Sequence, residues 1–306
     1  MTQAQPSTDS FIDADTVIPV ILDTDIGDDI DDTWALAMAL GRPELALRLI
    51  VTGFGDTSAR TRLVAKMLER MDRMDVPIGT GVATGSAPIH QMRWAGEYEM
   101  TRYPGVVHRD GVGAMIDVIH AEPGPVVVLS IGPMTNLKAA LERDPGIARK
   151  VRVVAMAGSV RTGYGPGSAA EPEYNVFQDV AAARAVFAAP WPITLAPLDS
   201  CMPVALSGND YKRVENAASD RARVVIENYD LWSRREEFGP EASSVLFDCV
   251  AAYLCWEESL CVMEDMRLVI DDAGCTVETP EGRPVRCAMD WKDLPAFKRL
   301  LIESLL

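Results

Sequence analysis

Short apolar runs alternate with helical patterns along the first two-thirds of the chain, and this alternation restricts the fold more than any other feature. The runs are continuous rather than alternating with polar residues, as is typical of strands that helices cover on both faces. Repeated strand–helix–strand units predict an α/β fold with a mostly parallel central sheet flanked by helices. We expect strands over residues 17–22, 45–52, 126–130, 151–157 and 193–196, and helices over residues 33–40, 58–74, 112–120, 134–142 and 180–188.

The last third of the chain has a different pattern. It predicts helices over residues 221–238, 243–256 and 294–305, and a β-hairpin formed by residues 266–270 and 275–287. No internal repeat and no long Pro/Gly/Ser-rich linker divides the chain. We therefore expect a single domain over residues 17–306, preceded by a flexible N-terminal segment of residues 1–16.

Composition and charge exclude several kinds of partner. The formal net charge of −16 argues against nucleic acid and against anionic membrane surfaces, which are bound by clustered Lys and Arg. No apolar run approaches the roughly 20 residues that span a bilayer, and the polar start of the chain shows no secretory signal. The six cysteines form no CxxC pair, and several lie in apolar stretches, as core residues of a reducing compartment do. We expect a cytoplasmic protein.

The most chemically informative segment is a run of acidic residues between the first predicted strand and the first predicted helix. Six of the ten residues from 23 to 32 are aspartates: Asp23, Asp25, Asp28, Asp29, Asp31 and Asp32. Carboxylates this dense repel one another unless a cation or protons offset their charge. Oxygen ligands alone suit a hard cation such as Ca²⁺ or Mg²⁺. The alternative is a helix cap within a solvated acidic turn.

Polar clusters also follow other predicted strands, at residues 53–56, 130–136 and 157–159. In open α/β sheets, ligands bind outside the carboxyl ends of the strands. We therefore expect these loops and the acidic run to meet at one crevice.

Residues 21–40, ILDTDIGDDIDDTWALAMAL, resemble the N-terminal signature of the inosine–uridine preferring nucleoside hydrolase family, DTDxGxDDAxA. Similar segments follow in order at residues 77–81, 108–113, 131–136, 173–179, 198–199 and 247–248. The resemblance spans nearly the whole chain. It implies a Rossmann-related α/β domain and a Ca²⁺-dependent enzyme that splits a ribonucleoside into ribose and free base. It also implies a homodimer or homotetramer.

The resemblance assigns roles residue by residue. Asp25 would both bind the metal and take a proton from the attacking water, and Asp23 would lie behind the metal ligands. The metal ligands would be Asp25, Asp32, the backbone carbonyl of Ile131 and Asp248. The residues that hold the ribose would be Asp31, Asp56, Glu173 and Asn175.

The reaction needs these residue types. Cleavage of an N-glycosidic bond passes through an oxocarbenium-like state, and carboxylates around the ribose stabilise its positive charge. A divalent ion lowers the pKa of its bound water, and a neighbouring carboxylate then removes the proton.

The chain departs from the family pattern in three places. The acidic run is two residues longer, so that either Asp29 or Asp31 takes the role of the second aspartate, with Asp29 as an additional metal ligand. Phe247 stands where many members carry a histidine thought to protonate the leaving base. Residues 163–167, rich in glycine, stand where many members carry a sugar-binding asparagine.

The residues that contact the base are open at this stage. His108 is either a pocket or a loop residue, and Tyr229 and Trp232 belong either to the core or to a base-stacking wall. Because Phe247 has no proton to donate, we expect poor turnover of inosine and uridine, and a preference for a better leaving group or a larger, modified base. Two other functions are a Mg²⁺-dependent phosphohydrolase and a nucleoside-binding protein without turnover.

Overall fold

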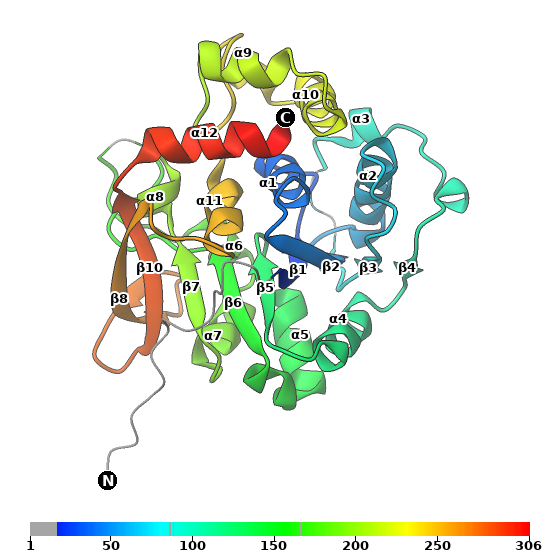
Figure 1. Ribbon diagram of the computed structural model, residues 1–306. Helices are drawn as coiled ribbons and strands as arrows, with labels where there is room; N and C mark the ends of the chain where they lie inside the picture. The colour runs from blue at the N-terminus through cyan, green and yellow to red at the C-terminus, as the bar shows by residue number, and fades with distance from the viewer. Residues whose placement is uncertain (1–16, 86, 88, 166) are drawn as a thin grey trace.

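The computed structural model describes residues 17–85, 87, 89–165 and 167–306 (Figure 1). The N-terminal segment predicted for residues 1–16 lies outside the described residues. Within the described ranges, no helix is both long and apolar enough to cross a membrane.

The described strands form one ten-stranded sheet in the order β4-β3-β2-β1-β5-β6-β7-β10-β8-β9. Neighbours run parallel from β4 through to β10, whereas β8 and β9 are antiparallel to their neighbours. The predicted mostly parallel sheet is thereby confirmed. The strands are β1 (Ile18–Thr24), β2 (Leu45–Thr52), β3 (Ile78–Thr80), β4 (Val107–His108), β5 (Val126–Ser130), β6 (Val151–Met156), β7 (Ile193–Ala196), β8 (Cys261–Ile270), β9 (Thr276–Glu278) and β10 (Arg283–Trp291).

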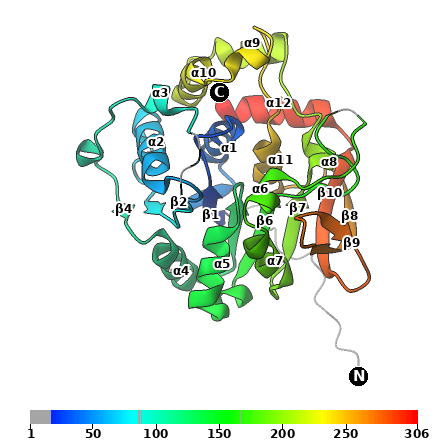
Figure 2. The same cartoon turned by 180° about the vertical axis from the view of Figure 1, so that it is seen from behind.

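Helices cover both faces of the sheet and create two cores (Figures 1 and 2). Successive side chains of β1 alternate between them, because Leu22 packs into one core and Ile21 into the other. The helices of the first core are α1 (Asp31–Leu40), α2 (Thr57–Arg70), α9 (Asn209–Glu215), α10 (Asp220–Leu231), α11 (Phe247–Leu254) and α12 (Leu294–Leu305). The helices of the second core are α4 (Gly111–Ala121), α5 (Thr135–Arg143) and α7 (Val180–Ala188). Three shorter helices are α3 (Met92–Ala95), α6 (Tyr174–Gln178) and α8 (Leu198–Cys201).

The chain direction across the sheet reverses at β1. From β1 the chain moves outward through β2, β3 and β4, and it then returns to place β5 on the other side of β1. The connections that leave β1 and β5 therefore diverge. Such a switch point opens a crevice at the carboxyl ends of the strands, next to the acidic run.

Several predicted elements of the C-terminal third differ from the structure. The helix predicted over residues 221–238 ends at Leu231, because Trp232 adopts extended backbone (φ −64°, ψ 131°) and turns its indole back toward the acidic run. The helix predicted over residues 243–256 begins only at Phe247, because the N–H groups of Ser243 and Leu246 donate to the carbonyls of Leu206 and Val204 instead of to a helical turn. The second hairpin strand is divided into β9 and β10 by a turn in which the Gly282 N–H donates to the Thr279 carbonyl.

Candidate active site

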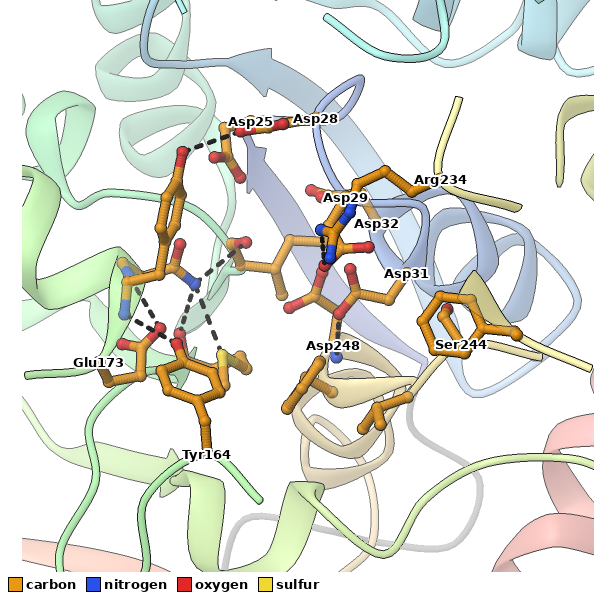
Figure 3. A pocket seen from close by; sticks show the side chains of 17 residues that line it. Asp25, Asp28, Asp29, Asp31, Asp32, Tyr164, Glu173, Arg234, Ser244 and Asp248 are labelled. Atoms are coloured by element: carbon orange, nitrogen blue, oxygen red, sulfur yellow. Dashed lines mark hydrogen bonds and ion pairs between the residues drawn. The ribbon is translucent and has the colours of Figure 1, made fainter. Parts of the chain in front are cut away.

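A cavity of about 350 Å³ opens at the carboxyl ends of β1, β5 and β6 (Figure 3). This volume matches that of small-molecule sites in enzymes. Its described lining residues are Asp25, Asp28, Asp29, Asp31, Asp32, Ile131, Met156, Tyr164, Glu173, Tyr174, Asn175, Arg234, Phe238, Ser244, Val245, Phe247 and Asp248.

Three buried carboxylates meet in this cavity. Asp31, Asp32 and Asp248 each offer an oxygen within 4.8 Å of the other two. Asp31 and Asp32 lie in the first turn of α1, and Asp248 lies in the first turn of α11. The Asp248 N–H donates to Asp31 Oδ2 at 3.3 Å, and the Thr24 hydroxyl donates to Asp32. Two helices distant in sequence thus converge on one acidic cluster.

A buried arginine holds the turn between β1 and α1. The Arg60 Nη1 donates to the carbonyl of Asp25 and, at 2.9 Å, to that of Ile26, while its Nε donates to the Phe54 carbonyl at 2.8 Å. Gly27 is left-handed (φ +122°), and a Cβ there would lie 2.7 Å from Ile89 Cγ2. The turn therefore has a fixed path, which explains why its aspartates face the cavity in defined positions.

Asp25 and Ile131 are brought together by the pairing of β1 with β5. The Ile131 N–H donates to the Asp23 carbonyl at 2.8 Å, and a Cβ on Gly132 would lie 2.7 Å from Asp25 Oδ1. Only glycine at position 132 leaves room for the Asp25 carboxylate. Asp23 lies behind the cavity wall, where its Oδ1 accepts a hydrogen bond from Asn136 Nδ2 at 2.8 Å.

Burial changes the acidity of these groups. It raises the pKa of Asp25 to about 7, an effect that the Arg60 guanidinium partly opposes. Burial, together with the charges of their neighbours, raises the pKa of Asp31, Asp32 and Asp248 well above the usual range. Four buried carboxylates with only oxygen donors fit a hard divalent cation, which would take the place of their protons.

Glu173 and Asn175 form a second polar region of the cavity. The Glu173 carboxylate caps α6 by accepting hydrogen bonds from the N–H groups of Asn175 (2.8 Å) and Val176 (3.3 Å). Asn175 Nδ2 donates to the carbonyls of Met156 (3.0 Å) and Ile131 (3.4 Å). These bonds fix both side chains beside the acidic cluster.

Two tyrosines that the sequence interpretation missed also line the cavity. The Tyr174 hydroxyl donates to Asp28 Oδ2 at 2.8 Å, and the Tyr164 hydroxyl accepts from the Tyr174 N–H at 3.0 Å. Tyr164 belongs to the glycine-rich segment that departs from the family pattern. That departure was the one signal in the sequence that pointed to it.

The opposite side of the cavity is built by the connection between α10 and α11. Figure 3 shows Arg234 and Ser244 on one side of the carboxylates, and Glu173 and Tyr164 on the other. Phe247 also lines the cavity, with its ring edge-on to that of Tyr164 (centroids 6.3 Å apart, 74° between planes). The sequence interpretation missed Arg234 and Ser244, because residues 234–244 were assigned mainly by helical periodicity.

Four residues predicted to contact substrate are not among the described residues that line the cavity. Asp56 is exposed and caps α2, accepting from the Ala59 N–H at 3.0 Å. His108 is exposed on the edge strand β4, separated from β1 by two strands. Tyr229 and Trp232 are buried in the core, where a planar aromatic side chain finds more apolar contact than at a solvent-facing wall.

Comparisons with known proteins show which proteins this chain is similar to. Residues 20–298 match the protein family described as inosine-uridine preferring nucleoside hydrolase. The pyrimidine-specific ribonucleoside hydrolase RihA of Enterobacter sp. (strain 638) is 30% identical over 253 residues, which are 78% of this chain and 79% of that protein. Uridine nucleosidase 1 of Arabidopsis thaliana is 28% identical over 217 residues, covering 67% of this chain and 64% of that protein. The solved structure of a purine-preferring ribonucleoside hydrolase from Gardnerella vaginalis has a TM-score of 0.79 at 21% identity, covering 94% of this chain and 98% of that one.

Proposed function

The chain belongs to the inosine-uridine preferring nucleoside hydrolase family, and from this premise we propose that it is a Ca²⁺-dependent hydrolase of a ribonucleoside or related N-riboside. The products are ribose and the free base. One observation carries the proposal. The buried cluster of Asp31, Asp32 and Asp248 lies with Asp25 in a cavity large enough for a nucleoside.

The residues that would hold the ion are Asp25, Asp32, Asp248 and the carbonyl of Ile131. Asp31 belongs to the acidic cluster, whereas Asp29 Oδ1 accepts from the Ile30 N–H at 2.7 Å and Asp29 Oδ2 lies 3.9 Å from Arg234 Nη1. This contrast favours Asp31, rather than Asp29, in the role of the second aspartate. When bound, the ion would acidify a water molecule and bind ribose hydroxyls.

The protein side chains divide the remaining work. Asp25 takes the proton of the attacking water, a role that its position beside the acidic cluster supports. Glu173 and Asn175 hold the ribose, and the surrounding carboxylates stabilise the positive charge that develops on it.

The preferred base is argued from the cavity, because the named relatives differ between pyrimidine-specific and purine-preferring enzymes. Phe247 presents an apolar ring to the cavity and has no proton to give to the leaving base. We therefore expect higher turnover with an activated leaving group, or with a larger and modified base, than with inosine or uridine.

A phosphohydrolase is less compatible with the cavity. Among the described lining residues, Arg234 is the one cationic side chain, and Glu237 already pairs with it through two hydrogen bonds of 2.9 and 2.8 Å. A transferring phosphoryl group needs several cationic or N–H donors around it.

We also propose that the enzyme acts in the cytoplasm as a homodimer or homotetramer, without nucleic-acid or membrane partners. All six cysteines are free and five of them are buried, which supports a reducing compartment. Sedimentation of the purified protein tests the oligomeric state.

The experiment that tests the function measures free-base release and bound metal on the same sample. Wild-type protein should contain Ca²⁺ and should release base. Removal of the ion with a chelator should abolish release, and Ca²⁺ should restore it. Full activity of the metal-free protein would contradict Ca²⁺ dependence, and absence of release from every riboside tested would contradict the hydrolase function.

A further inference from the structure

We propose that Arg234 contacts the departing base and stabilises the negative charge that develops on it, and that the Ser244 hydroxyl orients the base for this contact. The inference rests on the proposed function and deepens it. It gives a role in leaving-group departure to a side chain of the connection between α10 and α11, because Phe247 can supply no proton.

Arg234 and Ser244 lie on the same side of the cavity. The acidic cluster lies in the middle of the cavity, with Glu173 on one side and with Arg234 and Ser244 on the other (Figure 3). With the ribose held by the cluster and Glu173, the side of Arg234 remains as space for its base, and this is the orientation that the proposal assumes. Phe238, which stacks on the Trp232 indole, and Phe247, which lies edge-on to Tyr164, also line the cavity, and their rings provide apolar surface for a planar base.

Ser244 and Arg234 both have polar atoms that can hydrogen-bond to a ligand. The Ser244 side chain is only 2% exposed, and its hydroxyl has no partner among the described residues. Arg234 uses Nε and Nη2 on Glu237, while Nη1 lies 3.9 Å from Asp29 Oδ2, beyond hydrogen-bond distance. A buried hydroxyl without a partner is costly, and a ligand atom would satisfy it. The Nη1 group offers N–H donors to the same ligand.

Trp232 holds the Arg234 side chain in place. Its guanidinium carbon lies 5.4 Å from the centre of the Trp232 ring, and Phe238 stacks on the same indole (centroids 5.9 Å apart, 17° between planes). The Trp232 Nε1 donates to the Asp28 carbonyl at 2.9 Å. Trp232 is thus a positioning residue that joins the base side of the cavity to the aspartate turn, and it holds Arg234 ready before substrate arrives.

The reaction balances with these residues. The C1′–N bond breaks and its electron pair goes to the base, while the oxygen of water forms a bond to C1′. Asp25 takes one proton of that water. Arg234 gives up no proton, but donates hydrogen bonds to an acceptor atom of the base as negative charge spreads onto it. The base gains its proton from solvent, and Asp25 returns its proton to solvent.

The test compares leaving groups. A series of substituted phenyl ribosides, from phenyl to p-nitrophenyl, is hydrolysed by wild type and by Arg234→Met in the Ca²⁺-loaded enzyme. Removing one donor to a developing anion typically costs about 10²–10³-fold. We expect a loss of that size for phenyl riboside, inosine and uridine, and a much smaller loss for p-nitrophenyl riboside, whose leaving group needs little assistance. The dependence of kcat/KM on leaving-group pKa should become steeper.

Three further variants test the serine, the need for a positive charge, and the effect of removing an unrelated arginine. Ser244→Ala should lose about three- to tenfold on nucleosides, as expected for one neutral hydrogen bond. Arg234→Lys keeps the charge and should recover part of the loss. Arg223→Met, an exposed arginine of α10 paired with Asp220, should match wild type.

An equal loss of Arg234→Met on all leaving groups, or no loss on any, would overturn the proposal. Inactivity of wild type itself on every riboside would instead overturn the proposed function. Far-ultraviolet circular dichroism and Ca²⁺ affinity, measured for each variant, separate misfolding from the loss of a contact.

Discussion

At the scale of single residues, the acidic run contains aspartates with different tasks. Asp31 and Asp32 point into the cluster with Asp248, Asp28 accepts from Tyr174, and Asp29 faces Arg234. The density of charge predicted a cation site from the sequence alone. The division of tasks was not predictable, because it depends on Asp248, which lies 216 positions beyond Asp32.

Asp25→Asn should lower kcat by about 10²-fold or more, because general-base assistance typically contributes 10²–10⁴-fold. The amide keeps an oxygen for the cation but cannot accept the proton of the water. Steady-state kinetics at saturating Ca²⁺ provide the measurement. Full turnover by a variant that still binds Ca²⁺ would show that another carboxylate, such as Asp29, is the base.

Asp248→Ala should abolish tight Ca²⁺ binding, because it removes one of three clustered carboxylates and leaves Asp31 and Asp32 without their partner. Calorimetric titration measures the affinity directly. Asp272→Ala, which removes an exposed carboxylate paired with Arg184 outside the cavity lining, is the matched control. Equal affinity of the Asp248 variant and wild type would remove Asp248 from the proposed metal site.

At the scale of elements, the continuous apolar runs predicted β1, β2, β5, β6 and β7, but not the short strands β3 and β4 at the edge of the sheet. The bounds predicted for β2, β5 and β7 are those of the structure, because burial on both faces leaves a clear signal in sequence. The bounds of α7 were also predicted, from the helical spacing of its apolar residues. The connection between α10 and α11 was not predictable in this way. Its path depends on the hydrogen bond from Trp232 to Asp28, a contact between segments far apart in the chain.

Asp56 was predicted to hold the ribose, but in the structure it caps a helix. Its carboxylate accepts from the Ala59 N–H and caps α2, at a distance in sequence that fits a helix N-cap. Asp56→Ala should lower the free energy of unfolding by about 1 kcal/mol and leave KM unchanged. Urea unfolding and steady-state kinetics test this. A raised KM with unchanged stability would instead return Asp56 to the ribose site.

At the scale of the whole molecule, the sheet order explains why the site lies where it does. The reversal of chain direction at β1 separates the connections that follow β1 and β5 and leaves an opening between them. Helix α11, which belongs to the last third of the chain, closes this opening with Asp248. The sequence predicted a crevice at the strand ends by this rule. It did not predict which distant segments complete the crevice. The spacing of apolar residues indicates which face of a helix or strand is buried, but not which other segment packs against that face.

Burial of so many carboxylates also makes the stability of the whole fold depend on pH and on the cation. The pKa of Asp25 and that of Asp23 are raised by burial to about 7, from a usual value near 4. Between these two pH values the ion-free folded protein binds more protons than the unfolded chain. Its free energy of unfolding therefore falls as pH rises from about 4 to about 7.

Urea unfolding with a chelator present should show the ion-free protein to be less stable at pH 7.5 than at pH 5. Added Ca²⁺ should stabilise it more at pH 7.5 than at pH 5, because protons compete with the ion for the same oxygens. Asp248→Asn, which has one buried carboxylate fewer, should lose less stability over the same interval. Greater stability of the ion-free wild type at pH 7.5 would mean that the buried aspartates are not destabilised as anions, and the argument for a cation in this cavity would lose its physical basis.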